Sequence, residues 1–210
     1  MIGIIELMLY FVFSYMFRNV YKSLKDIEVV SYYWYIMTVL TFVWETSYII
    51  YFNEISADSS DLIMNNKHVW LSKYPLDSII PWKLAKIFYA EYGAYADREY
   101  MLMGNDWSII IEGTHAHICG IFSLLVLIFK INNSISMGSQ LMNSILYLSN
   151  YGIQTTDMYN VNYNRANFPC GSFLCKRPFM YINIFWTIMP VYSIIQLIRK
   201  NFYNYQKNLL

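Results

Sequence analysis

Five long apolar segments dominate the sequence, and stretches that contain charged or turn-forming residues separate them. The segments are residues 2–21, 30–52, 107–129, 135–152 and 179–198. Each has close to the roughly 20 residues that a helix needs to cross the hydrocarbon core of a bilayer. The pattern predicts an all-α membrane protein built as a five-helix transmembrane bundle, with residues 1–210 forming a single integral membrane domain.

Basic residues lie at or just after the ends of the first, third and fifth of these segments. They are Arg18, Lys22, Lys25, Lys130, Arg199, Lys200 and Lys207. If the five helices alternate in direction, all of these charges lie on the same side of the membrane. The positive-inside rule assigns that side to the cytosol, which predicts a cytosolic C-terminus.

The longest connection, residues 53–106, carries two patterns of its own. Residues 58–61 read Asp-Ser-Ser-Asp, which is typical of a turn that caps a helix. Residues 82–95 place aromatic side chains at helical spacing. The second pattern predicts an amphipathic helix that lies in the headgroup region.

Composition supports a membrane location and excludes several classes of function. Hydrophobic residues make up 57% of the chain and charged residues 14%, whereas soluble domains average about 25% charged residues. The formal net charge of +1 gives no single-sign field that would attract nucleic acid. We find neither a Gly-rich phosphate loop nor His and Cys residues at metal-ligand spacing, so we expect no cofactor, no metal and no nucleic-acid partner. Cys170 and Cys175 could form a disulfide if their loop faces an oxidising compartment, and the sequence leaves this question open.

Besides Glu6 in the first of them, the apolar segments contain two carboxylic acids, Glu45 and Glu112, whose burial needs an explanation. Helical spacing places Glu45 on one face with Thr41 and Tyr48. It places Glu112 on one face with His115. A single buried Glu can simply hydrogen-bond across a bundle, and His115 taken alone fits such a structural role.

The fourth and fifth segments add further polar side chains, Gln140, Tyr147, Asn183 and Trp186. Because lipid cannot satisfy hydrogen bonds, we expect these groups to face one another or a cavity. Two carboxyl groups in different surroundings can divide the roles of acid and base between them. An indole face stabilises a neighbouring cation. The set indicates carbocation chemistry on an apolar substrate, in which protonation of an alkene and loss of a neighbouring proton shift a double bond.

Several motifs occur together in a recognisable order. Residues 88–100, with Asp97 and Tyr100, resemble "KEYxxxDxRY", although their internal spacing departs from it by one position. Residues 120–123 resemble "GPxS" and residues 140–147 resemble "GQxxxxxLY". Residues 183–190 match "NxxWxxxP". In this order the chain resembles the emopamil-binding protein family of sterol Δ8–Δ7 isomerases, in the EXPERA superfamily that includes the sigma-2 receptor.

The resemblance implies a core over residues 30–200 with a sterol-sized cavity open to the bilayer. It implies proton transfer by Glu45 and Glu112, with His115 as a possible helper. It also implies a multi-pass protein of the endoplasmic reticulum membrane whose substrate is a sterol or another hydrophobic isoprenoid, and it leaves a homodimer open. The substrate-binding residues that it implies are Thr41, Tyr48, Asp97, Tyr100, Gln140, Tyr147, Asn183 and Trp186.

One departure from the family pattern keeps alternatives open. The isomerases carry His-x-x-x-Glu in the second helix, whereas this chain has Thr41 in place of the histidine. A threonine cannot exchange a proton at neutral pH as an imidazole can. We therefore expect a sterol double-bond isomerase, with a related terpenoid isomerase or cyclase, or a non-catalytic ligand-binding protein like the sigma-2 receptor, as alternatives.

Overall fold

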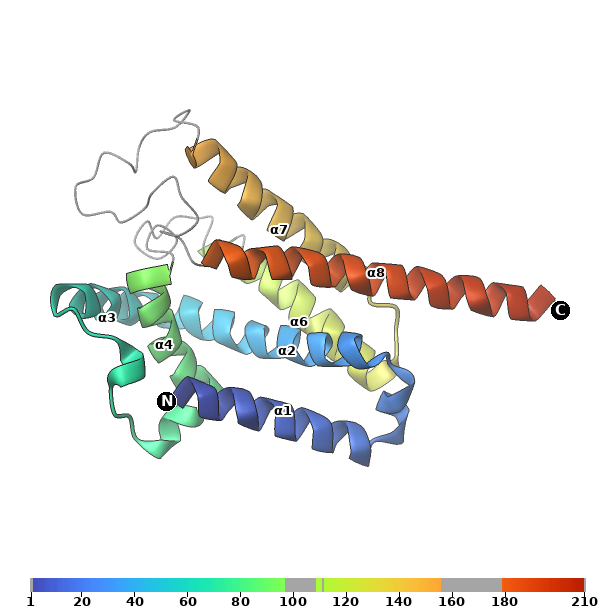
Figure 1. Ribbon diagram of the computed structural model, residues 1–210, viewed down its shortest axis with the longest axis horizontal. Coiled ribbons are helices and arrows are strands. Elements are labelled where there is room, and N and C mark those ends of the chain that lie inside the picture. The colour runs from blue at the N-terminus through green and yellow to red at the C-terminus, as the bar shows by residue number, and fades with distance from the viewer. Residues whose placement is uncertain (1, 97–108, 111, 156–178, 210) are drawn as a thin grey trace.

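The regular structure of the chain is entirely helical in the part that the computed structural model describes, residues 2–96, 109–110, 112–155 and 179–209 (Figure 1). The long helices are α1 (Ile2–Val20), α2 (Val29–Ile50), α6 (Glu112–Phe129), α7 (Ser134–Thr155) and α8 (Phe179–Leu209). The shorter elements are α3 (Phe52–Met64), α4 (Pro81–Glu91), a π-helical turn (Tyr92–Ala96) and three 3₁₀ turns at Lys22–Asp26, Val69–Leu71 and Leu76–Ile79. The prediction of an all-α fold is confirmed.

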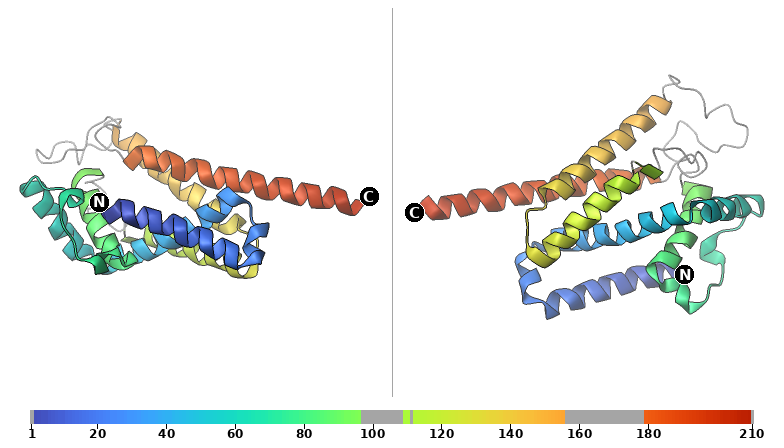
Figure 2. Two further views of the ribbon diagram at one scale, coloured as in Figure 1. Left: turned by 60° about the horizontal axis from the view of Figure 1, so that its bottom comes forward. Right: turned by 180° about the vertical axis from the view of Figure 1, so that it is seen from behind.

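The long helices extend along a common direction with successive helices reversed, and α3 and α4 cover one end (Figure 1). Helix α2 packs against α6 and α4, whereas α7 packs against α6 and α8. The N-terminus lies beside α4, and the last part of α8 projects beyond the opposite end of the bundle (Figure 2). At that opposite end Lys130 pairs with Asp26 at 2.7 Å, which ties the α6–α7 connection to the α1–α2 connection.

Local hydrogen bonds explain where α2 begins. The carboxylate of Glu28 accepts hydrogen bonds from the backbone amides of Val30 and Ser31 at 3.0 and 2.8 Å. These amides have no partner inside the helix, so Glu28 acts as its N-cap. After Ile50 the chain bends by 87° into α3.

Residues 58–61 lie inside α3, so the prediction of a capping turn there is wrong. The hydroxyls of Ser59 and Ser60 donate to the carbonyls of Ile55 and Ser56, one turn back, at 2.9 and 3.0 Å. These bonds satisfy both serines within the helix. The Ser59 hydroxyl also reaches the carbonyl of Ala90 at 3.0 Å, which joins α3 to α4.

Two glycines of α6 let it approach α2 closely. A Cβ built on Gly120 would lie 2.3 Å from the Cβ of Phe42, and one built on Gly113 would lie 2.4 Å from Cδ1 of Ile49. Small residues at a helix–helix interface allow this close approach, which is a common device in membrane bundles.

The outer surfaces of the long helices carry many large apolar side chains, while both apolar and polar side chains are buried between the helices. Large apolar side chains are exposed along the long helices, among them Met8, Phe13, Met16, Ile121, Ile128, Met142, Ile188 and Ile198. Polar side chains are buried between the helices, among them Ser31, Thr38, Ser47, Ser123, Ser136, Gln140, Asn183 and Ser193. By length and composition, one described helix (Tyr181–Phe202) can cross a membrane, or two if the bent pair α2 and α3 is one span. The five-span arrangement stays a prediction.

Candidate functional site

A cavity of about 1110 Å³ lies among α1, α2, α4, α6, α7 and α8. Aromatic and aliphatic side chains form most of its wall, including Phe11, Trp34, Met37, Leu40, Trp44, Trp70, Phe88 and Met189. It borders two buried clusters, one around Trp34 and Met189 and the other around Tyr89 and Tyr92. A mostly apolar wall with a few polar groups is typical of a site for a hydrophobic small molecule.

The structure brings together most of the residues that the sequence singled out. Seven of them line the cavity: Thr41, Glu45, His115, Gln140, Tyr147, Asn183 and Trp186. Tyr48 lies outside this lining and is fully buried, with its ring stacked on that of Tyr89 at 5.0 Å. Glu112 is the first residue of α6, but its side chain lies outside the described part of the structure, as do Asp97, Tyr100, Cys170 and Cys175.

The carboxyl group of Glu45 has a partner on the neighbouring helix α4. The hydroxyl of Tyr89 donates a hydrogen bond to Oε1 of Glu45. Stacking on Tyr48 and an edge contact with Tyr92 at 5.8 Å between ring centres hold the Tyr89 ring in place. The aromatic spacing of residues 82–95 was the available signal for Tyr89, but its pairing with Glu45 depends on how α4 packs against α2.

Thr41 lines the same cavity one turn before Glu45, but its hydroxyl serves the helix backbone. It donates to the carbonyl of Met37 at 3.0 Å. A hydroxyl has a single proton to donate, so this bond uses the donor of Thr41. Thr41 therefore lines the cavity without a hydroxyl proton left to donate into it.

A hydrogen-bonded network fixes the aromatic wall of the cavity opposite α4. Gln140 accepts a hydrogen bond from the indole nitrogen of Trp34 at 2.8 Å and donates to the hydroxyl of Thr38 at 2.9 Å. The Trp34 ring meets that of Trp186 edge-on, with 4.6 Å between ring centres. Gln140 on α7 thus orients an indole on α2, which in turn packs against the indole of α8.

Two buried hydrogen-bond donors in the lining have no partner among the described residues. They are the side-chain amide nitrogen of Asn183 and the indole nitrogen of Trp44. Only 3% of the Asn183 surface is exposed. A buried donor without a partner is costly, so these groups suit a ligand that presents a hydrogen-bond acceptor.

Glu91, at the end of α4, is a lining carboxylate that the sequence interpretation did not include in the site. It accepts hydrogen bonds from Nδ1 of His68 at 2.6 Å and from the backbone amide of Val69 at 3.0 Å. The ring of Tyr95 lies over His68 at 4.2 Å. These contacts hold the segment before Trp70 against α4, so that Trp70 reaches the cavity wall.

The two histidines of α6 have different surroundings. His115 lines the cavity and is half-buried. In His117, Nδ1 lies 2.6 Å from the carbonyl of Gly113, and Nε2 lies 3.4 Å from the hydroxyl of Thr46. His117 thus makes local contacts within α6 and to α2, in keeping with a structural role.

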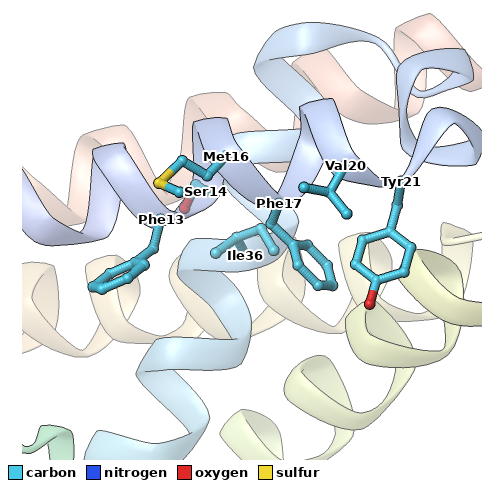
Figure 3. A pocket seen from close by; sticks show the side chains of 7 residues that line it. All are labelled: Phe13, Ser14, Met16, Phe17, Val20, Tyr21 and Ile36. Carbon is cyan, nitrogen blue, oxygen red and sulfur yellow. The ribbon is translucent and has the colours of Figure 1, made fainter.

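A second, smaller hollow of about 410 Å³ lies against α1 (Figure 3). Its lining is Phe13, Ser14, Met16, Phe17, Val20, Tyr21 and Ile36. It contains no carboxylate, histidine or cysteine, and it continues the apolar outer surface of α1. This hollow therefore offers no carboxyl or imidazole group that could exchange a proton with a substrate.

Comparison of the chain with protein-family models, with curated proteins and with solved structures finds no match.

Proposed function

We propose that the chain is a multi-pass protein of the endoplasmic reticulum membrane that moves a double bond in a sterol from the Δ8 to the Δ7 position. The observation that carries the proposal is that Glu45 and Trp186 line one large, mostly apolar cavity. A carboxyl group can move a proton, and an indole face can stabilise a cation in surroundings that exclude water. The order of motifs that resembles the emopamil-binding protein family supports the same reaction.

The apolar exterior of the bundle supports the membrane location. Exposed Phe, Ile and Met side chains cover far more of α1 and α8 than the scattered apolar residues of a soluble surface. The polar side chains point inward, where they hydrogen-bond one another, as in the Trp34–Gln140–Thr38 network. Both features agree with five helices surrounded by lipid.

The proposed reaction conserves atoms and electrons without a cofactor. An acid, Glu112 in this proposal, gives a proton to one alkene carbon, and the π electrons form the new C–H bond. The neighbouring carbon becomes cationic beside Trp186. Glu45 then removes a proton from the next carbon, and the electrons of that C–H bond form the shifted double bond. The cavity exceeds the range of about 300–1,000 Å³ usual for ligand pockets, which leaves room for a rigid tetracyclic substrate.

Complementation of a sterol-isomerase-deficient cell tests the proposal. The chain is expected to restore Δ7 sterols, and the Glu45→Gln variant, which keeps the shape but not the acidity of the side chain, is expected to lose about 100-fold or more of the turnover. Equal expression of both proteins is the control. Unchanged sterol profiles despite good expression would contradict the sterol assignment, and activity on a linear polyprenoid would favour the terpenoid isomerase or cyclase.

A second candidate is a non-catalytic ligand-binding protein, which the hydrogen bond of Thr41 to its own helix favours. The isomerases have an imidazole at this position, and Thr41 offers no replacement for it. A binding protein would take up a sterol saturably without forming product. In that case the Glu45→Gln and Glu112→Gln variants would keep much of their affinity for the sterol. Neither the variants nor the unmodified protein would show turnover.

A further inference from the structure

Helix α4 supplies a side chain to the proposed reaction from outside the five long helices. We propose that Tyr89 is a positioning residue for Glu45, a role that rests on the proposed function. Its hydroxyl holds Oε1 of the carboxyl group and so fixes the orientation of the group that exchanges the substrate proton.

The geometry of α4 makes this contact specific. Tyr89 is 7% exposed, and its ring is fixed between those of Tyr48 and Tyr92. From the outer side Lys86 pairs with Glu54 of α3 and lies 4.3 Å from the ring centre of Tyr51. With the backbone held by these contacts, the Tyr89 hydroxyl reaches Oε1 of Glu45.

The direction of the hydrogen bond assigns a role to Glu45. The hydroxyl of Tyr89 donates and Oε1 accepts. A donor of this kind stabilises a carboxylate more than a neutral carboxylic acid. Glu45 is therefore suited to accept the proton that the cation loses, while the proton that starts the reaction comes from another acid in the cavity.

The pairing also offers a physical answer to the missing histidine. In a His-x-x-x-Glu pair the imidazole lies one helical turn from the carboxyl group. Here that turn carries Thr41, whose donor is used by Met37, and a tyrosine from a different helix contacts the carboxyl group instead. Tyr89 orients Glu45, but a phenol is too weak an acid to exchange protons readily at neutral pH.

The test compares Tyr89→Phe with Tyr32→Phe in the full-length purified protein. Tyr32 is a matched control because it is fully buried and its hydroxyl donates to the carbonyl of Ser14 at 2.7 Å, away from the cavity. With a Δ8 sterol, Tyr89→Phe is expected to lower kcat by about 10- to 100-fold with KM within about twofold, and Tyr32→Phe to keep kcat. An unchanged kcat in Tyr89→Phe, or a rise in KM alone, would overturn the proposal.

A second readout separates this proposal from the proposed function. Infrared difference spectra locate the Glu45 carboxyl band by its loss in Glu45→Gln, and Tyr89→Phe is expected to shift that band. In the Glu45→Gln background, Tyr89→Phe is expected to cause no further loss of turnover, because Tyr89 acts through Glu45. If the protein shows no turnover but Tyr89→Phe shifts the band, the sterol assignment fails and the Tyr89–Glu45 pairing stands. If Tyr89→Phe leaves the band unshifted, the pairing is refuted.

Discussion

The side chain of Gln140 uses both of its polar ends within the protein. Its carbonyl oxygen accepts from Trp34 and its amide nitrogen donates to Thr38. Besides lining the cavity, Gln140 therefore orients its aromatic wall. Through Trp34 it supports Trp186, the ring proposed to face the cation.

A double-mutant cycle of Trp34→Phe and Gln140→Leu measures this coupling. Both residues are buried, so each single change leaves a polar group without its partner. The two changes together are expected to cost about 1 kcal/mol less free energy of unfolding than the sum of the single changes. Unfolding in mixed micelles gives these values, and strict additivity would show that the hydrogen bond contributes nothing.

Glu28 ties the stability of α2 to pH. Burial alone would raise the pKa of its carboxyl group. The hydrogen bonds from the amides of Ser31 and Val30 have the opposite and larger effect, so the pKa lies below its usual range. The stabilisation is fully present above the pKa of the unfolded chain, about 4.3, and is lost as the pH falls through the lower pKa of the folded protein.

Glu28→Gln tests this account of the cap. At pH 7 the variant is expected to lose about 1 kcal/mol of unfolding free energy relative to the parent protein. Below pH 4 the difference is expected to shrink as the carboxylate of the parent protein is protonated. Thermal unfolding of both proteins at several pH values measures this difference in unfolding free energy. A difference that is the same at pH 7 and pH 3 would contradict the role of the charge.

Among the helices, the sequence predicted well those that depend on long apolar runs. The boundaries of α1, α2 and α7 lie within a few residues of the expected ones, because apolar side chains at helical spacing over about 20 residues are the strongest local signal of a helix. Helix α8 continues beyond the expected residue 198 to Leu209. The polar α3 was missed because its serines bond back to their own helix, a local choice that composition does not reveal.

The interface of α2 and α6 is expected to depend on Gly120. Gly120→Ala places a methyl group 2.3 Å from the Cβ of Phe42, which cannot move without its backbone, so we expect a loss of about 1–3 kcal/mol. Gly138→Ala on α7 is the matched control, since a Cβ there meets nothing within 4 Å. It is expected to be neutral or to stabilise the helix by up to about 1 kcal/mol. Equal unfolding free energies of the two variants would contradict the close contact.

For the molecule as a whole, the sequence predicted which helices would supply the polar groups, but not how the short helices complete the cavity. From helical spacing and the cost of polar groups in lipid, we predicted that Glu45, Asn183 and Trp186 would lie together, and all three line the cavity. Tyr89 and Glu91 were not predicted in the site, because their position depends on how α4 and the segment at Val69 fold back over the end of the bundle. Such contacts between distant segments follow from tertiary packing, which no local pattern encodes.

The central claim is that this cavity moves a proton onto and off a sterol. It is tested most directly by incubating the purified protein with a Δ8 sterol in D₂O and analysing the product by mass spectrometry. We expect a Δ7 sterol that carries one solvent deuterium, with formation strongly reduced in Glu45→Gln. Recovery of the Δ8 sterol unchanged and free of deuterium, from a folded protein that binds it, would contradict the claim.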